Sequence, residues 1–208
     1  MNRIVYLLPL VLLWARAGLA DQSYDVTVNT APLNGMMGYL AFDFISGTPA
    51  GNAATISNFS SDGAPGMLTD SGSATGTVSP GPGEMTDSQF FNELLQGFTF
   101  GKQLSFELAL STNFVAGNVP DNFSFYLLDS GQNSFSTSDP TGSDALLSID
   151  ITGLDATPVV YTSSSATLAI TPVSGMVSIP EPSSFAIVMV ATALLLAREF
   201  RKGTAFRR

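Results

Sequence analysis

The chain of 208 residues contains no cysteine and no histidine. Without cysteine there is no disulfide, so a folded domain must rely on a buried apolar core or on a partner. Without histidine, the Ser-His-Asp and Cys-His arrangements of nucleophilic catalysis and the usual zinc sites are excluded. The groups left for enzyme chemistry are carboxylates, hydroxyls and Lys102.

Positive charge is also scarce in the middle of the chain. Between Asp21 and Ile179 there are fifteen acidic residues and one basic residue, Lys102, which gives this body a formal charge of −14. Such a surface repels nucleic-acid phosphates and anionic membranes, so nucleic-acid binding is excluded. The same charge attracts cations and basic partners.

What the body does contain is apolar residues that alternate with polar ones. The chain has fifteen phenylalanines, and the twelve that lie in this body supply material for a core. Period-two alternation, bounded by Gly, Ser, Asp and Pro turns, predicts β-strands. The predicted strands are 24–29, 38–44, 54–59, 104–110, 123–128, 145–151 and 166–170. We therefore expect an all-β fold over residues 21–170, a single jelly-roll-like β-sandwich.

Two stretches depart from this pattern. Residues 60–83 are rich in Gly, Ser, Thr and Pro and predict a long loop with one or two weak strands, such as 74–78. Residues 86–96 predict one short helix, because Asp87 can cap it, its phenylalanines and leucines form an apolar stripe, and Gly97 can end it. Residues 171–182 are expected to be a linker.

The first twenty residues have the three parts of a secretory signal peptide. Arg3 supplies the positive charge, residues 4–14 supply the apolar segment, and small residues precede a cleavage site between Ala20 and Asp21. Eleven apolar residues are too few to span a bilayer comfortably, which disfavours an uncleaved membrane helix. The pattern predicts export by Sec-type machinery.

The other end of the chain carries a second membrane signal. Residues 183–197 contain no ionisable group and predict a short transmembrane helix, reaching roughly 22 Å. The basic residues that follow, within a cytoplasmic tail of residues 198–208, act as the stop: Arg198, Arg201, Lys202, Arg207 and Arg208. Before the apolar run stands Pro180-Glu181-Pro182, whose prolines favour an extended segment open to a protease.

This tripartite tail resembles the PEP-CTERM sorting signal of exported bacterial proteins, with Pro180, Glu181 and Pro182 as the recognition motif. The resemblance implies processing by an exosortase-like membrane protease in a Gram-negative cell that makes exopolysaccharide. The protein would be held in the inner membrane transiently and then delivered to the cell surface or extracellular matrix. A permanent single-pass anchor is the alternative.

Two segments of the body, residues 21–30 and 95–101, look like those of a family of uncharacterised PEP-CTERM exported proteins. This likeness implies one fold over the body. It implies no activity and adds no catalytic residue.

Aspartates in several turns are candidates for calcium, which binds carboxylate and carbonyl oxygens on bent loops. The candidates are Asp129, Asp139, Asp144, Asp150 and Asp155. None follows the EF-hand spacing, and Asp and Gly are also the ordinary residues of turns between strands. The turn interpretation is preferred, and no metal or other cofactor is expected.

Other side chains are candidates for carbohydrate chemistry. Glu84, Glu93 and Glu107 could supply the two carboxylates of a glycosidase, although nothing in the sequence pairs them. Tyr39, Tyr126 and Tyr161 could stack on sugar rings, or could simply lie at a partly wet surface.

The sequence as a whole predicts a structural or interaction module of the bacterial surface or biofilm matrix, associated with exopolysaccharide and without enzymatic activity. The alternatives are a carbohydrate- or calcium-binding adhesin, an enzyme acting on matrix polysaccharide, and a permanently anchored membrane protein.

Overall fold

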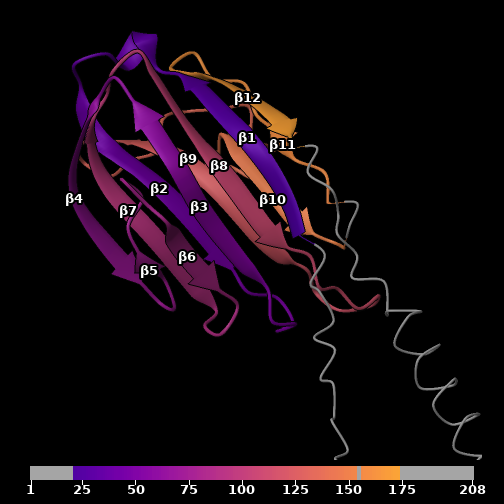
Figure 1. The fold of residues 1–208 in the computed structure, drawn as a ribbon. Coiled ribbons are helices and arrows are strands. Elements are labelled where there is room, and N and C mark those ends of the chain that lie inside the picture. The colour runs from indigo at the N-terminus through magenta and orange to yellow at the C-terminus, as the bar shows by residue number, and fades with distance from the viewer. Residues whose placement is uncertain (1–20, 154–155, 174–208) are drawn as a thin grey trace, which may run out of the picture. The chain divides into compact units, whose positions relative to one another are not determined.

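The computed structural model describes residues 21–153 and 156–173, which form two antiparallel β-sheets with almost no helix. Sheet A has the strand order β12-β1-β8-β3-β6-β5, and sheet B has the order β11-β10-β9-β2-β7-β4. In Figure 1 the long strands of both sheets run along one common diagonal. The all-β prediction is confirmed, and the two sheets are arranged as a β-sandwich.

The strands of sheet A are β1 (Asp21–Asn29), β3 (Ala53–Ser61), β5 (Thr75–Gly76), β6 (Gly83–Thr86), β8 (Gln103–Ser111) and β12 (Thr167–Pro172). Those of sheet B are β2 (Met37–Ile45), β4 (Ala64–Ser71), β7 (Phe91–Thr99), β9 (Asp121–Asp129), β10 (Leu147–Ile151) and β11 (Val159–Val160). A 3₁₀ turn, η1 (Ala31–Leu33), follows β1. Each of the seven strands predicted from alternation is present, with ends that differ by a few residues.

Neighbouring strands in each sheet come from distant parts of the chain. From β1 to β4 the chain passes from one sheet to the other at every step, so β1 pairs with β8 and β2 pairs with β7. Such non-local pairing cannot be read from turn signals, which report only on sequence neighbours.

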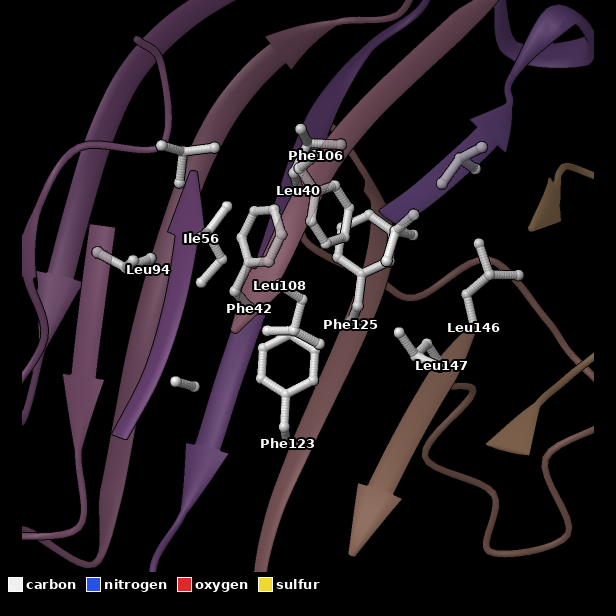
Figure 2. Close-up of a cluster of buried hydrophobic side chains, with 14 of the residues drawn as sticks. Leu40, Phe42, Ile56, Leu94, Phe106, Leu108, Phe123, Phe125, Leu146 and Leu147 are labelled. Atoms are coloured by element: carbon white, nitrogen blue, oxygen red, sulfur yellow. The ribbon is translucent and has the colours of Figure 1, made fainter. Parts of the chain in front are cut away.

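The core lies between the sheets and is rich in phenylalanine. Phe42 of β2 and Phe125 of β9 are register partners in sheet B, with ring centroids 4.9 Å apart. Phe106 of β8 in sheet A meets both rings, with centroids 5.2 Å from Phe42 and 5.3 Å from Phe125. Figure 2 shows the three rings gathered between the strands. The two contacts of Phe106 are edge-to-face, and aromatic contacts of this kind add to the gain from apolar burial.

The helix predicted over residues 86–96 is wrong. The first residue belongs to β6, and residues 91–96 belong to β7, where burial alternates along the strand. Leu94 faces the core, whereas Leu95 faces outward, so the apolar stripe is split between two faces. The buried positions beside Leu94 hold Asn92 and Gln96. Their polarity conceals the period of two, which is why the helical period fitted better.

The long loop predicted over residues 60–83 is wrong where β4 occupies eight of its residues at the edge of sheet B. The weak strand predicted at 74–78 is present as the two-residue β5. Strand β4 pairs with β7 through a register shift between Pro65 and Leu68. Gly66 lies within that irregular stretch. Such composition is typical of a protected edge strand, where a bulge and proline discourage pairing with other chains. At the other end of the body, β12 runs to Pro172, two residues into the predicted linker.

A buried polar network joins the loops β2–β3, β6–β7 and β8–β9. Asn52 donates from Nδ2 to the carbonyl oxygen of Asn113 and to Oδ2 of Asp121, both at 2.8 Å, and its Oδ1 accepts the Asn113 N–H at 2.7 Å. Oδ2 of Asp87 accepts the three backbone N–H groups of residues 50–52. Asp87 therefore caps a turn of the β2–β3 loop rather than a helix.

Replacing Phe42 with alanine should lower the free energy of unfolding by about 3–5 kcal/mol, because it empties the centre of the core. Urea unfolding of the full-length chain checks this. Phe90, which is 75% exposed, provides the matched control, and Phe90→Ala should change stability by no more than about 0.5 kcal/mol. Equal effects of the two substitutions would contradict the central role of the Phe42 ring.

The Asn52→Ala substitution should cost about 2–3 kcal/mol of unfolding free energy, because it removes the partner of the buried Asp121 Oδ2 and of the half-buried backbone groups of Asn113. Asn34, an exposed asparagine in a turn, offers the comparison, and its change to alanine should be nearly neutral. A neutral Asn52→Ala variant in the same urea titration would show that water replaces the network.

Candidate functional site

The faces of the two sheets that point away from the core differ in chemistry. On sheet A the outward positions of β1 and β8 hold small or polar residues, among them Ser23, Thr27 and Ser105. On sheet B the outward positions include Tyr39, Leu95 and other apolar or aromatic residues. A solvated face like that of sheet A is expected for an antiparallel sheet, so the candidate site lies on the outer face of sheet B.

The register of sheet B arranges its outward residues in rows across the strands. One row runs from Leu95 on β7 through Ala41 on β2 to Tyr126 on β9. The residue at the centre of this row, Ala41, is only 3% exposed although it faces away from the core. This apolar row forms one border of the site.

The next row brings two carboxyl groups side by side. Asp43 of β2 lies directly opposite Glu93 of β7. On its other side Asp43 faces Ser124 of β9, whose hydroxyl donates to Oδ1 of Asn122 at 2.7 Å. A further row, with Ile45 opposite Phe91, borders the acids on the far side. We call Asp43 and Glu93 the acid pair.

The acid pair is unfavourable for folding as it stands. Like charges directly opposite each other destabilise a sheet. Oδ1 of Asp43 is the one side-chain oxygen or nitrogen of the described residues that is buried without a hydrogen-bond partner. Lys102, the only basic side chain in the described part of the chain, lies instead near Asp62. The backbone hydrogen bond from Gln103 is the main reason that the pKa of Asp62 is lowered, and the charge of Lys102 makes a smaller contribution.

Burial and charge both act on the protonation of this pair. Burial, followed by the charge of Glu93, raises the pKa of Asp43 to about 7. Burial also raises the pKa of Glu93. A neutral Asp43 is therefore favoured in the folded protein at mildly acidic pH, because the charged form has lost its solvation.

A groove adjoins the apolar row and runs between β2, β4 and β7. It has a volume of about 570 Å³ and is mainly apolar. Its lining includes Met37, Tyr39, Met67, Leu95 and Gly97. Gly97 leaves the floor open, since a Cβ there would lie 3.1 Å from the Met67 carbonyl oxygen and 3.8 Å from the Tyr39 ring. Leu95 links the groove to the acid pair, two residues away along β7.

The three glutamates considered as hydrolase residues are not brought together. Glu93 lies on the outer face of sheet B, whereas Glu84 of β6 and Glu107 of β8 belong to sheet A. Oε2 of Glu107 accepts a hydrogen bond from Asn58 at 2.8 Å. The partner of Glu93 is Asp43, which sequence reasoning missed. The sequence did contain a signal, because Asp43 stands between Phe42 and Phe44 as the one charged residue of its strand.

The predicted sugar-stacking tyrosines fall on or beside the same sheet. Tyr39 and Tyr126 occupy outward positions of β2 and β9. Tyr161 follows β11, and burial raises its pKa, with the charges of Asp139 and Asp150 and the nearby Tyr126 adding to the effect. The structure thus brings Tyr39 and Tyr126 to the face that carries the acid pair.

The calcium candidates in the described residues accept hydrogen bonds from nearby donors. Oδ1 of Asp129 accepts the N–H groups of Gly131 and Asn133, and the backbone hydrogen bond from Asn133 is the main reason that its pKa is lowered. Burial alone would raise the pKa of Asp139, but hydrogen bonds from residues 141–145 lower it.

The remaining two candidates that can be described behave similarly. Oδ1 of Asp144 accepts the Thr137 N–H, and Oδ1 of Asp150 accepts a hydrogen bond from Asn122. Asp155 lies outside the described residues. In the part of the chain that the structure describes, no three acidic side chains gather in a group that could hold a metal ion.

The sorting and processing residues lie outside the described range, apart from Asp21, whose backbone begins β1. This applies to Ala20, to Pro180, Glu181 and Pro182, and to the basic residues from Arg198 to Arg208. Across residues 21–153 and 156–173, no helix is long and apolar enough to cross a bilayer. The predicted transmembrane segment, residues 183–197, lies beyond this range and stays a prediction.

Comparison of the chain with protein-family models, with curated proteins and with solved structures gives no match.

The raised pKa of Asp43 predicts that the protein loses stability as the pH rises. The folded state retains a proton that the unfolded chain releases near pH 4, so the stabilising contribution is full below that pH and is lost as the pH rises through about 7. We expect the unfolding free energy to be roughly 2 kcal/mol lower at pH 8 than at pH 5. Asp43→Asn should remove most of this difference.

Urea unfolding at the two pH values measures this effect. Asp25→Asn removes an exposed carboxyl from sheet A and should leave the difference between pH 5 and pH 8 in place. An Asp43→Asn variant with the pH dependence of the unaltered protein would rule out Asp43 as its source.

Proposed function

We propose that the protein is an exported surface or matrix protein of a Gram-negative bacterium, whose body is a non-enzymatic interaction module. The observation that carries this proposal is the order of Pro180-Glu181-Pro182, an apolar run and a basic end in the tail, together with a signal peptide at the other terminus. The proposed partners are Sec-type export machinery and an exosortase-like protease.

The arrangement of the body supports this function. Strands β1-β8-β3-β6 in one sheet pack against β2-β7-β4 in the other, an order that supports a jelly-roll-like sandwich. Its core holds the phenylalanines without any disulfide, and its outer faces remain for contact with partners. A fold, however, does not imply an activity, so the function is argued from the tail and the outer face of sheet B.

A carbohydrate-binding adhesin is the second candidate, and one specific observation favours it. The outer face of sheet B combines an apolar groove beside Tyr39 with a few polar groups next to it. Ligand sites are commonly concave, mainly apolar and fitted with a small number of polar groups. Exopolysaccharide is the partner that this candidate implies.

The tail predicts that the mature protein loses its C-terminus. Mass spectrometry of protein recovered from the surface of the source cells should find no peptide from residues 198–208, because cleavage near Pro180-Glu181-Pro182 separates them from the body. In a Glu181→Ala variant the full-length form should accumulate in the inner membrane.

Glu199, on the other side of the apolar run, provides the control, and Glu199→Ala should be processed normally. Recovery of an intact basic end from the unaltered protein would overturn the proposal and favour a permanently anchored single-pass protein.

A further inference from the structure

We propose that the outer face of sheet B binds a polysaccharide that carries free ammonium groups, such as a partly N-deacetylated hexosamine polymer. The sugar rings would occupy the groove beside Tyr39, and an ammonium group would bind between Asp43 and Glu93. The proposal rests on the proposed function, because an exported body is one that meets matrix glycans.

The groove suits the apolar face of a sugar ring. Tyr39 forms one side, Met67 of β4 forms the other, and Gly97 between them contributes no side chain. Met67 is 81% exposed and Met37 is 70% exposed, so both leave apolar surface uncovered beside the groove. Polar groups at the rim come from the turn after β9, where Ser130 and Gln132 line the groove. An amphipathic ring with a C–H face and hydroxyl edges matches such a lining.

The acid pair selects the charge of the ligand. Asp43 and Glu93 lie opposite each other, and within the described residues neither has a cationic partner. A cation between them converts a repulsive pair into an attractive site. The charge of an ammonium group held on the exposed side of the pair also favours the ionised form of Asp43, whose buried Oδ1 has no hydrogen-bond partner among the described residues. An anionic polysaccharide is repelled, both here and by the body charge of −14.

The spacing of the two features defines the length of the ligand. Tyr39 and Asp43 are four residues apart on the same face of β2, which places them about 13 Å apart along the strand. A single amino sugar can therefore reach the groove or the acid pair but not both. An extended oligomer that follows β2 and β7 can reach both, so affinity should rise steeply with chain length.

Calorimetry with the full-length chain in mild detergent tests the proposal, using a glucosamine pentamer at pH 6, where its amines are protonated. The fully N-acetylated pentamer and a galacturonic acid pentamer are the comparison ligands. We expect the glucosamine pentamer to bind about tenfold or more tightly than the acetylated one, and the acidic one not to bind. Binding should also release a proton from the acid pair, measured as a dependence of the heat on the buffer.

Two double variants with the same change in net charge distinguish binding at the acid pair from general attraction of a cationic ligand to the acidic body. Asp43→Asn with Glu93→Gln should weaken binding by about tenfold or more and abolish the proton release. Asp25→Asn with Glu107→Gln alters the equivalent register pair on sheet A and should keep the affinity within about twofold. Tyr39→Ala should weaken binding while keeping the proton release. Urea unfolding confirms that each variant is folded.

The proposal is overturned by equal losses in the two double variants, by equal affinity for the acetylated pentamer, or by the absence of binding. Cleavage of the pentamer, followed by mass spectrometry, would also overturn it and assign a hydrolase instead. None of these results bears on the removal of the C-terminus, which the processing experiment tests separately.

Discussion

The structure depends on the burial of one face of each sheet against the other. No disulfide is available, so the apolar core between the sheets must supply much of the stabilisation, with Phe106 of sheet A meeting Phe42 and Phe125 of sheet B at its centre. Because side chains alternate along a strand, committing one face to the core commits the other face to the outside. The properties of the outer faces are thus a consequence of how the core is built.

The outer face of sheet B carries the acid pair, which lowers the stability of the fold. A register that buries Phe42 and Leu94 also places Asp43 beside Glu93, and no local charge compensates them. Like charges directly opposite destabilise a sheet, and the partial burial of Asp43 makes this cost larger than for the exposed Asp25 opposite Glu107 on sheet A. Proteins commonly tolerate unfavourable polar groups where a ligand is bound, because the ligand supplies the missing partner. The acid pair, the apolar row and the groove form one continuous surface that such a ligand can cover.

Among the other described residues, the buried polar side-chain atoms have hydrogen-bond partners, so Asp43 is the exception. Asn52 and Asp87 are held by hydrogen bonds that tie loops together, and Nδ2 of Asn92 donates to the carbonyl oxygen of Phe44 at 2.9 Å. Gln96 likewise donates to Gly66 within sheet B. These side chains have polar partners from distant parts of the chain, whereas Oδ1 of Asp43 has none among the described residues.

The sequence by itself determined the fold class, the exclusion of histidine and cysteine chemistry, and the strands with regular alternation, because composition and a period of two are local properties. It could not determine that β7 is a strand, since the phenylalanines and leucines of residues 90–95 fit a helical stripe as well. Only the tertiary structure decided that question, by giving Asn92 and Gln96 buried partners. It also decided the candidate site, because Asp43 and Glu93 are fifty residues apart and meet only through the register of β2 with β7.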